Sequence, residues 1–411
     1  MKIWIFNNYN MLPSQGGLNR HYFFAKQLQK MGHEPAVFVG SHPHNTNLQM
    51  IEGKEPFRLE SAETFPWVYV KTENYEGSKL KRIVSMFQYY RNAKKAAEAM
   101  VMTDGIPEAV IGSSAHPLAA VLAIRLGQKL KCKSIVEIRD LWPESIVAYG
   151  IAGAHNPAVL ILRWLEKWMY QKADAVIFTM EGAYNYILEQ GWEEKIPRSK
   201  VFYVNNGVNL EEFHYNRDHY KLEDEDLDNP EFFKVVYTGS IRQANNLGLV
   251  LDAAKQISHQ RIRFLIWGDG EQVASLRQRL IDENITNVKF KGKVEKKFIP
   301  SIVSRANLNL MHLPPHRIFN YGISPNKLFD YLAAEKPVLC DFPCAYNPAV
   351  QQGAGVLVEN ATPSNIASAI EQIEQLSPDA YQVYCESAKR TAEQYDFKCL
   401  AQKLIDIGER V

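Results

Sequence analysis

The sequence predicts an α/β protein with two doubly wound domains, each built on a parallel sheet. Short apolar segments alternate with longer segments of helical spacing, which is typical of a parallel sheet covered by helices. The alternation occurs twice, once on each side of a polar stretch at 214–231. The chain has 411 residues, which is enough for two domains that each bury a core of their own.

The first half is expected to contain seven strands. Lys2–Phe6 is the first, and a helix follows it over 18–31. The other strands are expected at 35–39, 68–70, 109–112, 134–138, Ala175–Phe178 and 201–204. Ligands of doubly wound sheets bind beyond the carboxyl ends of the strands, so the loops that follow these strands are candidate sites.

The second half repeats the pattern. Strands are expected at 234–237, 263–267, 288–290, Leu308–Met311 and 337–339, and helices at 246–258, 271–283 and 296–304. We therefore predict a first domain over 1–210, a second over 211–390 and a last helix over 391–411. The acidic residues of the stretch at 214–231 include the pattern Asp226-Leu227-Asp228, which we interpret as part of a solvated linker.

Composition limits the functional classes. Lys and Arg together number 47 and Asp and Glu 46, so no overall field favours nucleic acid as a partner. The five scattered cysteines favour free thiols in a reducing compartment. The polar start and the lack of a long apolar run predict a cytoplasmic protein, attached at most peripherally to the inner face of the cell membrane. No cofactor and no metal are expected.

The segment 322–338 predicts the start of a helix that faces an anion. Ser324 is a suitable N-cap and Pro325 suits the first helical position, and Asn326 and Lys327 complete the first turn. A helix start offers free N–H groups and partial positive charge, which bind phosphate. Asp330, one turn later, is placed to accept hydrogen bonds from ribose. An ordinary capped amphipathic helix would show the same residues.

Three further groups of residues are candidates for the site. Gly16 and Gly17 precede the first helix and permit a close approach of backbone to a ligand, although a flexible turn would also explain them. Arg139 and Asp140 follow the strand at 134–138, where they either contact substrate or form a structural bridge. A lone His116 follows the preceding strand, and such a residue is often only a packing residue.

In the second half, the loops after the first three strands supply the remaining candidates. Gly239 permits close approach and Arg242 is placed to bind phosphate. Gly268 and Val294 lie in the two loops that follow. Each of these signals is weak alone.

A basic segment at 79–100 combines six cations with apolar and aromatic residues. It predicts a helix that lies on an anionic membrane, and a core-packed helix with a solvated basic face is the alternative. The apolar helix at 163–170 is expected to belong to the core.

Two motifs resemble one family. SPNKLFDYLAAEKPVL, from Ser324, is similar to the donor-binding helix of the retaining glycosyltransferases of family 4, which have the GT-B fold and use nucleotide sugars. RDLWPES, from Arg139, resembles a segment that is characteristic of a bacterial subgroup of these transferases, which builds O-antigen, capsule and related polysaccharides. The family has two acidic residues near the helix. Asp330 matches the second, whereas Gly322 stands at the position of the first.

The resemblance implies a function and a set of roles. Two domains would face a central cleft, with a UDP-sugar as donor and a glycan or lipid-linked acceptor. Gly16 and Gly17 would face the donor diphosphate, Gly268 and Val294 would flank the base, and Arg139 and Asp140 would lie near the transferred sugar. Arg242 and Lys327 would stabilise the leaving diphosphate without a metal. A nucleotide-sugar 2-epimerase and a non-catalytic nucleotide-sugar-binding subunit are the alternatives.

Overall fold

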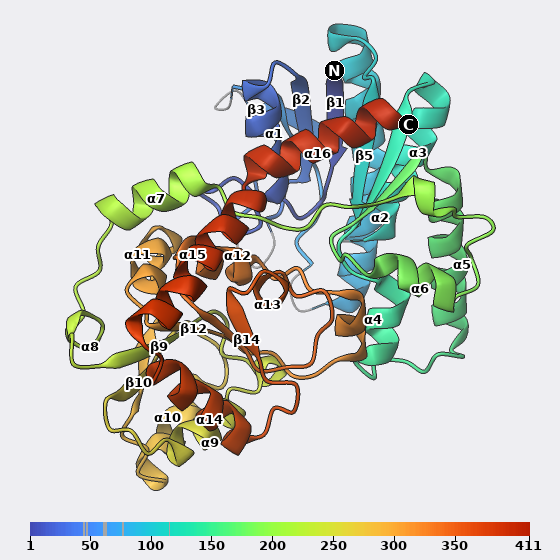
Figure 1. Ribbon diagram of the computed structural model, residues 1–411. Coiled ribbons are helices and arrows are strands. Elements are labelled where there is room, and N and C mark those ends of the chain that lie inside the picture. Colours follow the sequence, from blue (N-terminus) through green and yellow to red (C-terminus); the bar gives the residue numbers. More distant parts are fainter. Residues whose placement is uncertain (44–45, 47, 61–63, 76–77, 115) are drawn as a thin grey trace. The chain divides into compact units, whose positions relative to one another are not determined.

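The computed structural model describes residues 1–43, 46, 48–60, 64–75, 78–114 and 116–411 (Figure 1). The chain forms two compact units: the first comprises Met1–Asn205 and Phe397–Val411, and the second comprises Asn206–Asp396. Each unit is a parallel sheet with helices on its faces, so the predicted fold class is confirmed.

The sheet of the first unit has the strand order β3-β4-β2-β1-β5-β6-β7-β8. Its strands are β1 (Lys2–Phe6), β2 (Glu34–Gly40), β3 (Phe57–Glu60), β4 (Trp67–Val70), β5 (Ala109–Ser114), β6 (Lys133–Ile138), β7 (Ala175–Phe178) and β8 (Val201–Tyr203). All neighbours pair in parallel except β3, which pairs antiparallel to β4. The sequence did not predict β3, because this four-residue edge strand mixes apolar with charged residues and none of its residues is fully buried, as is common at sheet edges.

Helices cover both faces of this sheet. They are α1 (Arg20–Lys30), α2 (Lys79–Asp104), α3 (Pro117–Leu130), α4 (Trp142–Ala148), α5 (Pro157–Lys172), α6 (Ala183–Glu189) and α16 (Phe397–Arg410), with a 3₁₀ turn η1 (Arg198–Lys200). Alternate residues of β2 serve the two faces: Phe38 packs in the core under α2 and α3, and Val37 in the core under α1. The alternation follows from the two-residue period of a strand.

The last helix belongs to the first unit. Phe397, at the start of α16, stacks on Phe23 of α1 with ring centroids 5.2 Å apart, and Phe24 meets the same ring edge-on. The buried side of α16 also includes Leu400, Leu404 and Ile407. The chain therefore returns from the second unit to complete a face of the first.

The sheet of the second unit has the order β11-β10-β9-β12-β13-β14, with every pair parallel. Its strands are β9 (Phe233–Thr238), β10 (Ile262–Trp267), β11 (Val288–Gly292), β12 (Leu308–Met311), β13 (Val338–Cys340) and β14 (Gly355–Leu357). The prediction missed only β14, a short edge strand of three partly buried residues. Residues from these strands and from the helices on one face form a single core.

The helices of the second unit follow the strands in the alternation that the sequence predicts. They are α7 (Leu210–His219), α8 (Glu225–Asp228), α9 (Gly248–Gln256), α10 (Val273–Asp282), α11 (Ile299–Ser304), α12 (Asn326–Ala333), α13 (Pro348–Gln351), α14 (Pro363–Glu374) and α15 (Pro378–Gln394), with the 3₁₀ turns η2 (Gln243–Asn245), η3 (Lys296–Phe298) and η4 (Arg317–Tyr321). Within the described parts of the chain, no helix is both long and apolar enough to cross a bilayer.

The acidic stretch before β9 is structured, and our interpretation of a solvated linker is wrong there. Asp226 is buried and accepts a hydrogen bond from Lys289 at 2.6 Å, while Lys291 also contacts it. Asp228 pairs with Arg305 at 2.7 Å. The acids of this stretch thus neutralise lysines of β11 and an arginine after α11, which ties the stretch to the sheet.

The expectation that the helix at 163–170 belongs to the core is correct for only one side of α5. Glu166, Met169 and Tyr170 are buried, and Trp164 is exposed. The sequence could not separate these sides, because apolar residues surround the whole circumference of the helix.

Candidate functional site

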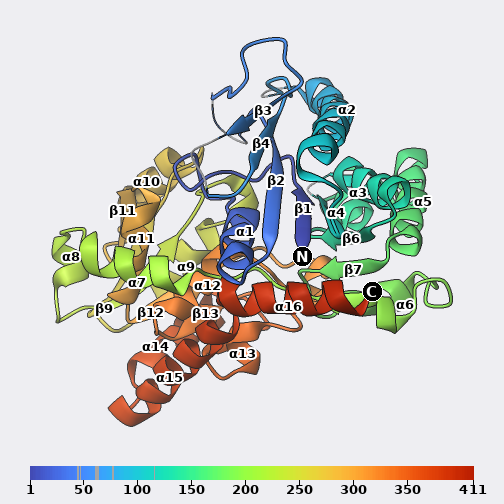
Figure 2. The same cartoon turned by 90° about the horizontal axis from the view of Figure 1, so that it is seen from above.

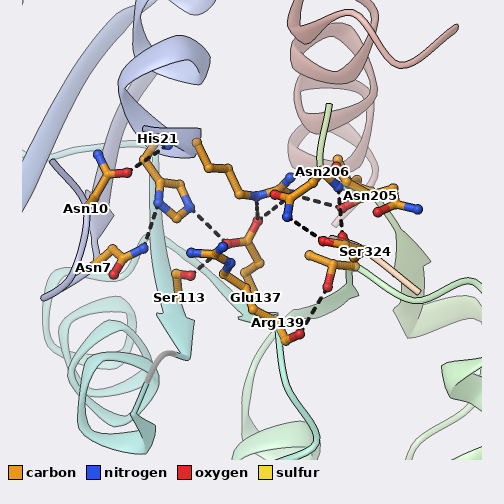
Figure 3. A network of polar contacts seen from close by, with 12 residues as sticks. Asn7, Asn10, His21, Ser113, Glu137, Arg139, Asn205, Asn206 and Ser324 are labelled. Atoms are coloured by element: carbon orange, nitrogen blue, oxygen red, sulfur yellow. Dashed lines mark hydrogen bonds and ion pairs between the residues drawn. The ribbon is translucent and has the colours of Figure 1, made fainter. Parts of the chain in front are cut away.

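The start of α12 lies at the carboxyl edge of the second sheet, after β12. Pro325 is its N-cap, and no side chain caps its first N–H groups. The prediction that Ser324 is the cap is therefore wrong by one residue. The Ser324 hydroxyl instead accepts a hydrogen bond from the Asn206 N–H at 3.1 Å, and its carbonyl accepts one from the Asn206 amide at 2.8 Å (Figure 3). The uncapped helix start keeps its capacity to bind an anion.

Lys327 brings a cation into the first turn of α12. Its ammonium group lies 4.1 Å from the centroid of the Tyr237 ring, in a cation–π contact. Burial lowers the pKa of Lys327 to about 8. No carboxylate in the described part of the chain forms an ion pair with it. A positive charge at a helix start is unfavourable for the helix, so this charge is available for an anionic ligand.

Asp330 follows one turn later on α12 and is half-buried. Burial raises the pKa of Asp330 to about 6, with Lys296 opposing the shift and Glu212 adding to it. Among the residues that the structure describes, none donates a hydrogen bond to this carboxylate. A half-buried acid without a donor costs stability, which is typical of a group reserved for a ligand.

Glycines allow the loops after β9 and β10 to pack closely against each other. Gly239 and Gly268 have φ values of 151° and 150°, where glycine is favoured. A Cβ on Gly268 would lie 1.7 Å from the Gly239 carbonyl, and one on Gly239 would lie 2.6 Å from the Lys327 ammonium. The two glycines therefore permit the loops to pack against each other and beside Lys327. Whether they also approach a ligand remains a prediction.

The other predicted residues of the second unit lie at the same edge of its sheet. Arg242 follows β9 as the N-cap of η2, and its side chain is exposed. Val294 follows β11 and is half-buried. Because all strands of this sheet are parallel, the loops after β9, β10, β11 and β12 emerge along one edge. The fold thus brings Arg242, Gly268, Val294 and α12 to a common side.

One buried pair at this edge escaped the sequence analysis. His312 and Asp341 directly follow β12 and β13, and His312 Nδ1 lies 2.6 Å from a carboxylate oxygen of Asp341. His312 Nε2 lies 3.1 Å from the Asn246 carbonyl. Both side chains are fully buried, so the pair holds the loop at Asn246 against the strand ends. A polar residue directly after a buried strand was the available signal.

A second polar network lies at the carboxyl edge of the sheet in the first unit, around Glu137 of β6 (Figure 3). One carboxylate oxygen accepts hydrogen bonds from Arg20 Nε and Nη2 at 2.9 and 2.8 Å. The other accepts one from the Ser113 hydroxyl at 2.7 Å and lies 2.9 Å from His21 Nε2. Burial opposes ionisation, but Arg20 and the donors from His21 hold the pKa of Glu137 well below its usual range.

The network determines which ring nitrogen of His21 carries the proton, and it anchors the backbone that follows β8. Asn7 uses its side-chain oxygen for the Tyr9 N–H and directs its amide nitrogen to His21 Nδ1 at 2.9 Å. His21 Nδ1 is therefore an acceptor, and Nε2 carries the proton that Glu137 accepts. Arg20 also donates to the carbonyls of Val204 and Asn205 at 2.8 and 2.6 Å. The buried Arg20 thus anchors the backbone directly after β8, at the last residues of this part of the first unit.

Within the described residues, none of the predicted residues of the first unit donates a hydrogen bond to Glu137, although the charge of Arg139 helps to lower the pKa of Glu137. Gly16 and Gly17 lie in the loop between β1 and α1, and neither has a positive φ. Arg139 is half-buried, its Nε has no hydrogen-bond partner within the described residues, and its carbonyl accepts a bond from the Thr179 hydroxyl. Asp140 is exposed, and no ion pair joins it to Arg139 in the described part of the chain, so the structural-bridge alternative gains no support.

Asp140 lies at a small cavity of about 20 Å³ with Ser114 and Trp142 among its lining residues. Such a volume suits about one water molecule. Glu166 also lines this cavity, and it accepts hydrogen bonds from Tyr170 and Tyr186 at 2.6 and 2.7 Å. Burial raises the pKa of Glu166 to about 7.

His116 is the N-cap residue of α3 and is fully buried. Its ring meets those of Tyr9 and Tyr89 edge-on at 5.8 and 5.6 Å. Burial, with Arg82 adding, lowers the pKa of His116 to about 3, so the imidazole is neutral. In the described structure neither ring nitrogen has a hydrogen-bond partner. Ala115, beside it, lies outside the described residues.

Comparisons with known proteins agree with this architecture. A family model described as Glycosyltransferase Family 4 matches residues 15–212, and one described as Glycosyl transferases group 1 matches residues 233–375. The probable glycosyltransferase WbjE of Pseudomonas aeruginosa is 24% identical over 239 residues, which cover 56% of this chain and 56% of that protein. The match thus spans little more than half the length of this relative.

Solved structures share the fold along the whole chain. The sucrose-phosphate synthase of Thermosynechococcus elongatus has a TM-score of 0.71 at 14% identity, covering 100% of this chain and 98% of that one. The HepE protein of Anabaena, in complex with UDP, has a TM-score of 0.67 at 13% identity, covering 100% of both chains. These likenesses establish the fold, and the two family models establish the class of enzyme. The chain is a glycosyltransferase of the GT-B type.

Proposed function

We propose that the protein transfers a sugar from a UDP-sugar to a glycan or lipid-linked acceptor, with retention at the anomeric carbon, in the synthesis of a cell-surface polysaccharide. One observation carries the donor part of the proposal. The uncapped start of α12, Lys327 and Asp330 follow one another within two turns, and among the described residues Lys327 has no carboxylate partner and the Asp330 carboxylate has no hydrogen-bond donor. The HepE protein, which has the same fold, was solved in complex with UDP and with UDP-glucose.

The three features match the parts of a nucleoside diphosphate. Free N–H groups and a lysine at a helix start favour a diphosphate. A carboxylate one turn further favours the two hydroxyls of a ribose, because it accepts hydrogen bonds from both. We propose that Arg242 adds a second cation from the loop after β9.

Transfer requires the bond between the anomeric carbon and the diphosphate oxygen to break while negative charge develops on the leaving diphosphate. The N–H dipoles of α12, Lys327 and Arg242 would stabilise that charge before the acceptor hydroxyl bonds to carbon. The acceptor hydroxyl would attack from the face that the diphosphate leaves, which retains the configuration, and its proton would pass to the departing diphosphate oxygen. We place Arg139 and Asp140 near the sugar, and we propose that the cations act without a metal.

The acceptor is proposed to be lipid-linked, with the protein attached to the inner membrane surface through α2. The segment predicted at 79–100 forms one helix of 26 residues. Its side toward the sheet carries Tyr89, Ala93 and Ala97, all buried. Lys81, Arg91, Lys94 and Lys95 are exposed, whereas Arg82 is half-buried over the Tyr9 ring. The Lys79 side chain lies outside the description.

Incubation of the protein with UDP-sugars tests the function. Release of UDP that depends on an added lipid-linked acceptor would support the transferase. Conversion of the UDP-sugar to its 2-epimer without an acceptor would instead identify an epimerase. Binding of UDP in calorimetry without any turnover would identify a binding subunit. A failure of UDP to bind would overturn the donor assignment.

A further inference from the structure

The buried pair of His312 and Asp341, in the second unit, has no part in the mechanism proposed above. His312 directly follows β12, Asp341 directly follows β13, and the loop at 239–247 connects β9 to α9. The three strands are adjacent in the order β9-β12-β13 (Figures 1 and 2). His312 therefore follows the middle strand, and its two ring nitrogens contact the segments that follow the strands on either side.

The contacts of His312 show that its Nε2 donates a hydrogen bond to the loop. Nε2 lies 3.1 Å from the Asn246 carbonyl oxygen, and a carbonyl oxygen can only accept, so Nε2 carries a proton. Nδ1 lies 2.6 Å from a carboxylate oxygen of Asp341, and this contact requires a second proton between the two groups. The pair with Asp341 thus fixes the ring so that an N–H group is directed at the loop.

The pair is costly to bury. His312 and Asp341 are both fully buried, and the second carboxylate oxygen of Asp341 has no hydrogen-bond partner among the described residues. Removal of such groups from water is unfavourable, and a buried pair is often no more stabilising than apolar side chains of the same volume. The contribution of the pair therefore lies in the geometry that it imposes on the loop.

The loop at 239–247 is held near both of its ends, and Arg242 lies between the two anchors. Near the first end, the Tyr237 hydroxyl donates to the Ser240 carbonyl at 3.0 Å. Near the second end, His312 donates to the Asn246 carbonyl. Asn246 has a φ of 48°, which residues other than glycine rarely adopt and which persists where the surroundings fix it. The exposed Arg242 side chain thus extends from a loop whose path depends on His312.

We propose that His312 is a positioning residue for the donor diphosphate. Its Nε2–H group fixes the Asn246 end of the loop, which places the Arg242 guanidinium where it meets the diphosphate. The inference rests on the proposed function, because it requires a nucleoside diphosphate to bind at the start of α12. His312 itself makes no contact with the ligand, since it is fully buried. Lys327 has a separate support, the Tyr237 ring at 4.1 Å, so His312 acts through Arg242.

Two substitutions of His312 separate its two contacts. The amide nitrogen of Asn reaches about as far as Nδ1 and that of Gln about as far as Nε2, so His312→Asn keeps the contact with Asp341 and His312→Gln keeps the contact with Asn246. Calorimetry with UDP should give a dissociation constant about five- to tenfold higher in His312→Asn than in the wild type, and His312→Gln should recover most of the affinity. Equal UDP affinities of the two variants would overturn the role of the Nε2 contact.

Uridine and a second substitution show whether the effect passes through Arg242 and the diphosphate. Uridine has no phosphate, so its affinity should be the same in His312→Asn and in the wild type. Arg242→Gln should weaken UDP binding by itself, and the addition of His312→Asn should weaken it no further, because substitutions that remove one shared interaction are not additive. A loss of uridine affinity, or additive effects of the two substitutions, would overturn the inference.

Tyr381→Phe is the matched control for a loss of stability. It removes another hydrogen bond from a side chain to a backbone carbonyl in the second unit, that of the Tyr381 hydroxyl to Asn307 at 2.7 Å, and Asn307 precedes β12, at the opposite edge of the sheet. This variant should melt at a lower temperature than the wild type and bind UDP equally well. An equal loss of UDP affinity in Tyr381→Phe and His312→Asn would show that affinity follows stability, which would overturn the inference.

The wild type separates this inference from the proposed function. A wild type that does not bind UDP would overturn the donor assignment and the role of His312 with it. A wild type that binds UDP, together with a His312→Asn variant that binds UDP equally well, would overturn only the role of His312.

Discussion

Replacing Asp330 with Asn should weaken UDP binding and at the same time stabilise the protein. Asp330 is half-buried on α12, and burial raises its pKa to about 6. At pH 7.5 it is ionised, and we propose that it accepts hydrogen bonds from the ribose. Hydrogen bonds to a charged group contribute about 1.5–3 kcal/mol, so the dissociation constant for UDP should rise roughly 10- to 150-fold.

The sign of the stability change follows from linkage. An acid whose pKa is raised by folding favours the protonated form, so the folded state loses stability as the pH rises from about 4 to about 6 and does not regain it above. The shift from 3.8 to about 6 sets an upper bound of about 3 kcal/mol. Solvent screening of a half-buried group reduces this to about 1–2 kcal/mol. Asn removes the penalty, so the melting temperature at pH 7.5 should rise.

Calorimetric titration with UDP and thermal unfolding at pH 7.5 measure the two effects on one preparation. Asp218→Asn is a matched control, because Asp218 lies on α7 with an exposed side chain paired to Arg217; it should change neither quantity by much. An unchanged dissociation constant in Asp330→Asn would refute the ribose role. A loss of both binding and stability would show that Asp330 is structural.

Three further predictions follow from the two polar sites. UDP should bind best between about pH 6 and pH 8, because Asp330 loses its charge below its pKa of about 6 and Lys327 loses its charge above its pKa of about 8; calorimetry across pH 5–9 that gives a flat profile would contradict this. Glu137→Gln should lower the free energy of unfolding by about 3–5 kcal/mol, because the substitution leaves the buried Arg20 guanidinium without its counter-ion. Urea unfolding measures this change. The control Glu98→Gln, which breaks the exposed pair with Lys129, should lower the free energy of unfolding by no more than about 1 kcal/mol. Transfer activity should survive EDTA, and a loss that a divalent cation restores would contradict the proposal that side-chain cations act alone.

The parts of the fold that the sequence predicts are those with a buried, continuous signal. Strands such as Ala175–Phe178 have a neighbouring strand on each side in a sheet covered on both faces, so every residue is apolar. The strands that escaped prediction, β3 and β14, are edge strands, where only part of each residue is buried. The apolar pattern of a sequence reflects which residues are buried, so it does not predict strands whose residues are only partly buried.

The candidate site divides in the same way. The start of α12 is a local feature, and its residues are adjacent in sequence, so pattern alone found Lys327 and Asp330. The network of Glu137 is not local, because its partner His21 lies 116 positions away. The sequence shows Glu137 inside an apolar strand and shows Arg20 and His21 shortly after a glycine pair, but it does not show that they are in contact. Only the strand order, which sets β6 two places from β1, brings them together.

The loop before α12 explains in physical terms why the chain departs from the family it resembles. The resemblance places an acidic residue at Gly322, but this residue ends η4 with φ 109° and ψ 174°. That region of backbone space is nearly exclusive to glycine, and another residue there would cost about 1–3 kcal/mol. The missing acid is therefore tied to the path of the chain between β12 and α12. We propose instead that the acid that contacts the donor sugar is Asp140, which is exposed after β6.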